Sequence, residues 1–125
     1  MILDTNAISA WAAGDPAATV MIEAAERIHL PVVVLGEFRY GLMGSRFRDQ
    51  LEMRLNKLER VAPILPVTRE TASVYSTLRY ELKQAGRPIP ENDVWIAALS
   101  RQHGLSVLSR DKHFDYVSGL RRMEW

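Results

Sequence analysis

Short apolar runs alternate along this chain with longer segments in which apolar residues recur every three or four positions. Runs of the first kind are typical of buried strands, and spacing of the second kind is typical of amphipathic helices. Alternation of strands and helices predicts a parallel sheet covered by helices on both faces, with right-handed connections. The predicted strands lie at residues 1–3, 28–30, 61–67 (near one edge of the sheet, because of its prolines) and 105–108, with a fifth at 120–125.

The longer segments begin at residues that favour helix starts. Thr5 or Asn6 is expected to cap the first helix, and Asp15 followed by Pro16 to start the second. Thr68 is expected to cap a later, long helix. The spacing predicts helices over residues 7–11, 16–28, 32–43, 47–60 and 69–85, and one more that ends at 103 before a glycine.

The amino-acid composition excludes several classes of protein. The 125 residues are enough for a single domain spanning 1–125, and the lack of cysteine excludes disulfides and thiolate zinc sites. No apolar run approaches the ~18 residues that span a bilayer, and the first residues do not form a secretory leader, so we expect a soluble, cytoplasmic protein. A net charge of +1 does not by itself indicate a nucleic-acid partner.

Four acidic residues lie where the predicted sheet would bring them together. Asp4 and Asp111 each follow a predicted strand, and Glu37 and Asp93 lie early in predicted helices. The carboxyl ends of parallel strands form one rim, where such sheets bind ligands. Two carboxylates ~4 Å apart repel by about 4 kcal/mol at an effective dielectric of 20, so a cluster that persists usually holds a cation or a shared proton. An all-oxygen site suits Mg²⁺ or Mn²⁺ and phosphodiester hydrolysis by water.

Each acid taken alone has a simpler explanation. Asp4 and Asp93 could be helix caps, Glu37 an exposed helical charge, and Asp111 a turn residue. The three histidines share no ligand spacing and are expected at the surface or at helix ends. The basic residues nearest the four acids in sequence could hold phosphates; they are Arg39, Arg46, Arg48, Arg87, Arg110 and Lys112.

Four motifs together resemble a known family. Leu3-Asp-Thr-Asn6, Leu35-Gly-Glu-Phe-Arg-Tyr-Gly41, Pro88-Ile-Pro-Glu-Asn-Asp-Val-Trp-Ile-Ala-Ala98 and Ser109-Arg-Asp111 resemble the PIN (PilT N-terminal) domain, and more narrowly the VapC toxins of bacterial toxin–antitoxin pairs. The resemblance covers nearly the whole chain. It implies an α/β/α sandwich with a central, mostly parallel sheet of four to five strands, and an endoribonuclease that depends on Mg²⁺ or Mn²⁺.

The resemblance also implies roles for individual residues. Asp4, Glu37, Asp93 and Asp111 match the family's acidic quartet, which is both catalytic and metal-binding. In the mechanism we expect, Asp4 and Asp93 hold the metal, and the other two acids complete its shell or orient the attacking water. The polar positions that support the acids are matched by Thr5, Asn6 and Ser109, and a further acid found in some members is matched by Asp115.

The partners follow from the same resemblance. It implies an RNA substrate, with transfer RNA favoured and ribosomal RNA the alternative, a VapB-type antitoxin that covers the active-site groove, and a homodimer. Residues 32–60 carry apolar side chains beyond one stripe, such as Met43 and Met53. They could line a groove for a partner helix, or they could simply fill the core.

Two other functions fit parts of the pattern. One is a catalytically silent PIN-like scaffold that binds RNA or protein, although the complete acidic quartet argues against it. The other is a phosphoacceptor signalling domain, which needs an acidic pair after the first strand and an acceptor Asp after the third. The third predicted strand ends in Leu65-Pro-Val-Thr68, without an acid, so this class is disfavoured.

Overall fold

Five short strands form the centre of the computed structural model, which describes residues 1–125. Every strand pair is parallel. A parallel bridge between Ile2 and His29 joins a three-stranded and a two-stranded group, which gives the order β3-β2-β1-β4-β5. The mostly parallel five-stranded sheet is therefore confirmed. The strands are β1 (Ile2–Leu3), β2 (Leu30–Pro31), β3 (Ile64–Leu65), β4 (Val107–Leu108) and β5 (Arg122–Met123).

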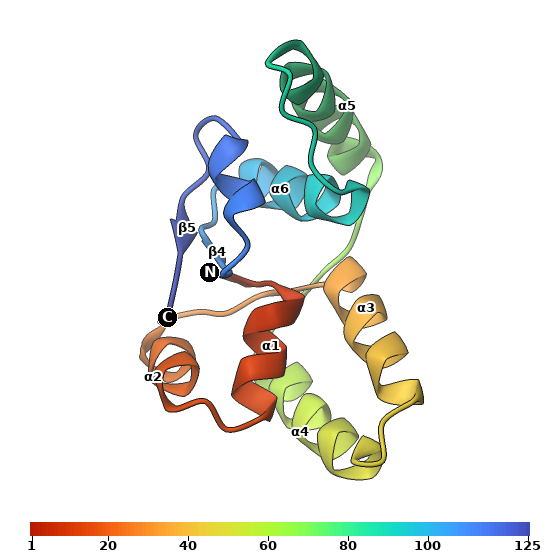
Figure 1. Cartoon of the computed structure of the whole chain (residues 1–125), viewed down its shortest axis with the longest axis vertical. Helices are drawn as coiled ribbons and strands as arrows, with labels where there is room; N and C mark the ends of the chain where they lie inside the picture. Colours follow the sequence, from red (N-terminus) through yellow and green to blue (C-terminus); the bar gives the residue numbers. More distant parts are fainter.

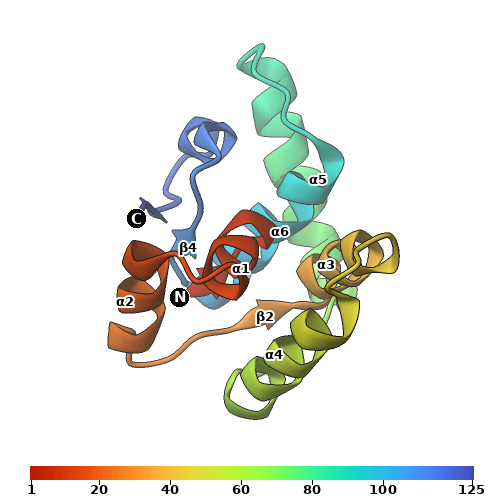
Figure 2. The same ribbon diagram turned by 60° about the horizontal axis from the view of Figure 1, so that its bottom comes forward.

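Helices cover both faces of this sheet (Figures 1 and 2). The first four helices lie together on one side of the strands, and α5, α6 and the short 3-10 segment η1 lie on the other. None of the helices is long and apolar enough to cross a membrane. Their bounds are α1 (Thr5–Ala12), α2 (Pro16–Ala24), α3 (Val32–Met43), α4 (Arg48–Val61), α5 (Arg69–Gln84), α6 (Glu91–His103) and η1 (Lys112–Tyr116).

Most predicted helix boundaries are confirmed. Asp15 caps α2 by accepting hydrogen bonds from two backbone N–H groups of the first turn, with Pro16 as the first helical residue. The side chain of Thr68 caps α5. Gly104 ends α6 in the left-handed conformation, with φ 64°, which a residue with a Cβ adopts only at a cost.

Three local expectations were wrong. The cap of α1 is Asp4 itself, whose carboxylate accepts from the N–H of Thr5. The second helix ends at Ala24 rather than at 28, because Ala25 is extended and the chain turns toward β2. Pro31, expected to lie after the strand, is its last residue; it needs no N–H there, and α3 starts at Val32 as predicted.

The core lies on both faces of the sheet, between the strands and the helices that cover them. The side chains of Ile96 and Leu99 on α6 are fully buried, and so are those of Leu3 and Leu108, which precede the polar rim of the sheet. Met43 and Met53 are exposed, as is Phe47, so these residues of the 32–60 region do not fill the core. The packing fixes both strand ends and the start of α6 relative to one another.

Candidate active site

Asp4 lies at the carboxyl end of β1 and is buried, with 5% of its surface exposed. It accepts hydrogen bonds from the Thr5 N–H at 2.8 Å, from Asn6 Nδ2 at 3.0 Å and from Ser109 Oγ at 2.6 Å. Burial raises the pKa of Asp4, the hydrogen bonds lower it, and the nearby charges of Glu37 and Asp111 raise it further. Asp4 is thus held rigidly, and two of the other acids act on it electrostatically.

Asp93 lies in the first turn of α6 and does not cap it. The N-cap position belongs to Pro90, with no side-chain hydrogen bond there, so the interpretation of Asp93 as a cap is wrong. Burial, followed by the charges of Asp111 and Asp4, raises the pKa of Asp93 to about 7. The side chain of Asp93 therefore faces the other carboxylates, and their charges raise the free energy of its ionised form.

Asp111 follows β4 and starts η1. Its Oδ1 accepts from the backbone N–H of His113 at 2.9 Å, and its own N–H donates to Ser109 Oγ at 2.9 Å. The ring atom Nδ1 of His113 lies 2.9 Å from Asp111 Oδ1 and 3.6 Å from Asp93 Oδ2. His113, expected at the surface or at a helix end, is 45% exposed, and its ring also faces the acidic cluster. Its position two residues after Asp111 was the signal that sequence reasoning missed.

Glu37, in the second turn of α3, joins this group from the other side. Thr5 Oγ1 donates to its Oε2 at 2.5 Å, and Asn92 Nδ2 donates to its Oε1. Asn92 precedes Asp93 on α6, so this hydrogen bond ties α3 to the start of α6. Sequence reasoning did not single out Asn92, although its position beside Asp93 in the first helical turn was visible.

The structure therefore brings the four acids to one rim of the sheet. No Lys or Arg forms an ion pair with any of them; His113 is the only basic partner, of Asp93 and Asp111. One ligand atom each from Asp93, Asp111 and His113 lies within 4.8 Å of the others. Clustered carboxylates, with raised pKa values at Asp4 and Asp93 and no neutralising guanidinium or ammonium group, fit a divalent cation. The carboxylates that would hold one are those of Asp4, Glu37, Asp93 and Asp111.

The supporting polar residues form a connected network behind the acids. Asn6 Nδ2 donates both to Asp4 and to Ser109 Oγ, the latter at 3.1 Å, while its Oδ1 accepts from the Arg110 N–H at 3.3 Å. Ser109 is fully buried. These bonds connect the end of β1 to the end of β4 and fix the carboxylate of Asp4.

Asp115 makes different contacts. It is exposed and forms a bidentate ion pair with Arg122, at 2.7 and 3.0 Å, which lowers its pKa. Among the basic residues near the acids in sequence, Arg39 pairs with Glu59, and Arg87 stacks over the ring of Tyr116, 5.1 Å from its centroid. Arg87 thus has no carboxylate partner and lies against η1, the segment that follows Asp111.

A groove of about 530 Å³ leads away from the acids between α1, α3 and α4. Thr5 and Glu37 line the end that meets the cluster. Phe38, Leu42 and Leu51 line its apolar part. A groove with apolar walls and a carboxylate at one end is suited to bind another molecule, and this groove extends the surface of the acidic rim.

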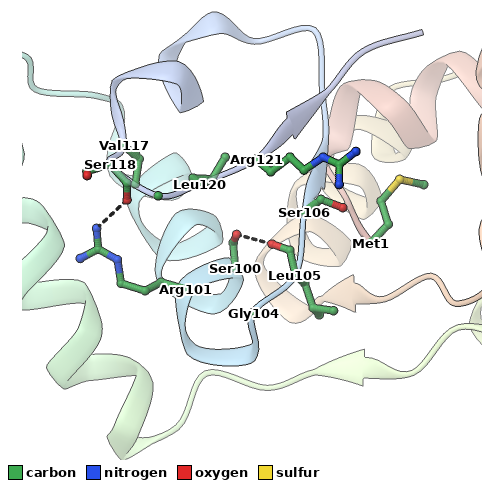
Figure 3. A pocket seen from close by; sticks show the side chains of 11 residues that line it. Met1, Ser100, Arg101, Gly104, Leu105, Ser106, Val117, Ser118, Leu120 and Arg121 are labelled. Carbon is green, nitrogen blue, oxygen red and sulfur yellow. Dashed lines mark hydrogen bonds between the residues drawn. The ribbon is translucent and has the colours of Figure 1, made fainter.

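A second hollow, of about 460 Å³, lies at the opposite rim (Figure 3). Met1 and Ser106, which line it, precede β1 and β4, so it opens at the amino ends of the strands. Two of its polar side chains are already paired, since Ser100 donates to the carbonyl of Leu105 and Arg101 donates to the carbonyl of Ser118. It contains no carboxylate and does not compete with the acidic rim as a candidate active site.

Comparisons with known proteins agree with this geometry. A family model described as PIN domain matches residues 1–120. Ribonuclease VapC5 of Mycobacterium tuberculosis is 33% identical over 125 residues, covering 98% of this chain and 91% of that protein. VapC ribonuclease Y4jK of Sinorhizobium fredii is 32% identical over 130 residues, covering 96% and 93%.

The fold is also found in solved structures. VapBC2 from Rickettsia felis, bound to a DNA fragment from its promoter, gives a TM-score of 0.89 over 99% of this chain and 97% of that chain, at 22% identity. Sequence similarity over nearly the full length, the same fold and four acids on one rim lead to one conclusion. The chain belongs to the PIN domain family and, within it, to the VapC proteins.

Proposed function

We propose that this chain is a metal-dependent endoribonuclease toxin of a type II toxin–antitoxin system, which hydrolyses RNA phosphodiester bonds in the cytoplasm. The observation that carries the proposal is the acidic cluster, in which burial and neighbouring carboxylates raise the pKa values of Asp4 and Asp93, with no Lys or Arg to neutralise them. The similarity to proteins named as ribonucleases supports the substrate class.

The four acids form two pairs with different roles in this proposal. Asp4 and Asp93 would hold a Mg²⁺ or Mn²⁺ ion, and Glu37 and Asp111 would add further ligands or orient the attacking water. Such an ion would lower the pKa of a bound water molecule and would neutralise charge on the phosphate. Thr5 and Asn92 keep Glu37 directed at the rim through their hydrogen bonds. Attack by water rather than by the RNA 2′-hydroxyl leaves a 3′-hydroxyl and a 5′-phosphate.

RNA cleavage tests the proposal directly. Purified protein is incubated with total RNA, and with separated transfer RNA and ribosomal RNA, in Mg²⁺, Mn²⁺ or EDTA, beside Asp4→Ala and Asp93→Asn purified identically. We expect discrete, metal-dependent fragments, with transfer RNA cleaved first, and none from either variant. Asp115→Asn is the matched control that keeps activity, because Asp115 is paired with Arg122. Fragments ending in 2′,3′-cyclic phosphate, or equal cleavage by Asp93→Asn, would overturn the mechanism.

We further propose that a VapB-type antitoxin occupies the groove between α1, α3 and α4. The relative from Rickettsia felis was solved as a VapBC complex. An amphipathic helix of the antitoxin would place apolar side chains against Phe38, Leu42 and Leu51 and would end at Glu37. Leu51→Glu should weaken antitoxin binding in calorimetry and leave RNA cleavage unchanged. Val20→Glu, at an exposed position of α2, should change neither.

A homodimer is the proposed assembly of the free toxin. Light scattering coupled to gel filtration measures its mass directly, and a monomer at micromolar concentration would contradict this part of the proposal.

A further inference from the structure

The ring nitrogen Nδ1 of His113 is shielded from solvent and makes no hydrogen bond. It lies 2.9 Å from Asp111 Oδ1 and 3.6 Å from Asp93 Oδ2. The nearer oxygen already accepts the backbone N–H of His113, and the ring nitrogen is not aligned to donate to it as well. A polar atom in such a place is normally paired, and the groups within its reach are two carboxylate oxygens, so a neutral ring could share a cation with them.

The position of the ring is fixed by the fold. Asp111 caps η1 through the His113 N–H, and Phe114, the next residue, is fully buried and anchors the segment in the core. The side chain of His113 is 45% exposed, so its outer edge reaches solvent while Nδ1 faces the acids. The nitrogen is thus placed among carboxylates by backbone and core contacts that do not involve a metal.

The other histidine with a shielded, unpartnered Nδ1 has different surroundings. Burial lowers the pKa of His29, and the positive charges of the N-terminal amino group and Arg27 lower it further. No carboxylate pairs with it. A cation has no reason to bind there, so the combination of an orphaned nitrogen and two convergent carboxylates is specific to His113.

We propose that His113 is itself a metal ligand, through Nδ1, together with one oxygen each of Asp93 and Asp111. This inference rests on the metal site of the proposed function and changes its donor set from all oxygen to mixed nitrogen and oxygen. Imidazole nitrogen suits first-row transition ions, whereas Mg²⁺ favours oxygen ligands. The metal site of this chain therefore binds a divalent transition ion in preference to Mg²⁺. Mn²⁺ is the transition ion used in the test below.

Metal binding by the free protein tests the proposal without reference to activity. The signal of unbound Mn²⁺ in electron paramagnetic resonance gives its dissociation constant, and competition by Mg²⁺ gives the selectivity. His113→Ala removes the ring and keeps the backbone N–H that Asp111 accepts. We expect this variant to bind Mn²⁺ roughly tenfold or more weakly, with Mg²⁺ affinity changed much less.

His103→Ala, at the exposed end of α6, is the matched control and should bind both ions as the wild type does. Unchanged Mn²⁺ affinity in His113→Ala, or equal loss of both ions, would overturn the proposal. Pulsed resonance on the Mn²⁺-loaded wild type adds a measurement that needs no variant. Coupling to an imidazole nitrogen is expected, and its absence overturns the inference.

The two proposals fail separately. Metal-dependent RNA cleavage with no nitrogen coupling would retain the nuclease and remove His113 from the ligands. Mn²⁺ bound through nitrogen without RNA cleavage would retain the ligand and overturn the nuclease.

Discussion

Replacing Asp93 by Asn removes one negative charge from the acidic rim. The Asp93 side chain is 13% exposed, and its one basic neighbour at short range is His113. Asn has nearly the same shape as Asp, so the substitution leaves the packing at the start of α6 unchanged. The metal-free protein should become more stable, which is the opposite of the usual effect of changing a half-buried residue.

The size of the effect follows from the pKa of Asp93, which burial and the charges of Asp111 and Asp4 raise to about 7. In the unfolded chain an Asp has a pKa of about 3.9, so the native state binds the proton more tightly. Stability therefore falls as pH rises from about 4 to about 7, and stays lower above that. At about 1.4 kcal/mol per pKa unit the full cost is about 4 kcal/mol, and solvent screening at this open rim reduces it to about 2.

Urea denaturation in EDTA measures this difference. At pH 8, Asp93→Asn should have a free energy of unfolding about 2 kcal/mol above that of the wild type, and near pH 4 the two should agree. Asp49→Asn, which removes an exposed charge from the first turn of α4, is the control and should show no such gain. Metal at 100 times its dissociation constant should stabilise the wild type by about 2.7 kcal/mol and the Asp93 variant far less.

The result that would refute this reasoning is a metal-free Asp93→Asn protein that is clearly less stable than the wild type at pH 8. The carboxylate would then make favourable contacts in the metal-free state, and the acids would not repel one another as the structure indicates. A gain of equal size at pH 4 and pH 8 would also contradict it, because the cost arises only when Asp93 is ionised.

Three further predictions concern residues around the site. Ser109→Ala should lower the unfolding free energy by about 2 kcal/mol at pH 8, measured in urea, since the buried carboxylate of Asp4 loses one of its three hydrogen-bond donors. Gly104→Ala should cost about 1–2 kcal/mol in thermal melts because φ is 64°, whereas Gly44→Ala, at φ −98° with open space around it, should not destabilise. The ion pair with Arg122 lowers the pKa of Asp115, so the stability that this pair contributes is lost when Asp115 is protonated below about pH 4. Asp115→Asn should therefore lose less unfolding free energy than the wild type over this pH range in an acid titration.

The sequence by itself was sufficient to predict the order of strands and helices along the chain. It was also sufficient to predict that the four acids lie at one rim of the sheet. Apolar runs that end at Asp4 and Asp111 place both residues at carboxyl strand ends, and parallel pairing then brings them to one side. Local signals also set most helix starts, as Asp15 and Thr68 show, because capping depends on residues that are neighbours in the chain.

Only the tertiary structure decided which side chains face one another across that rim. The hydrogen bond from Asn92 to Glu37 joins residues 55 positions apart, and no local pattern encodes it. The position of His113 beside Asp93 depends on how η1 packs against α6. The exposure of Met43 depends on the face that α3 turns to the sheet. Sequence periodicity reports one element at a time, whereas the environment of a side chain is set by contacts between elements distant in the chain.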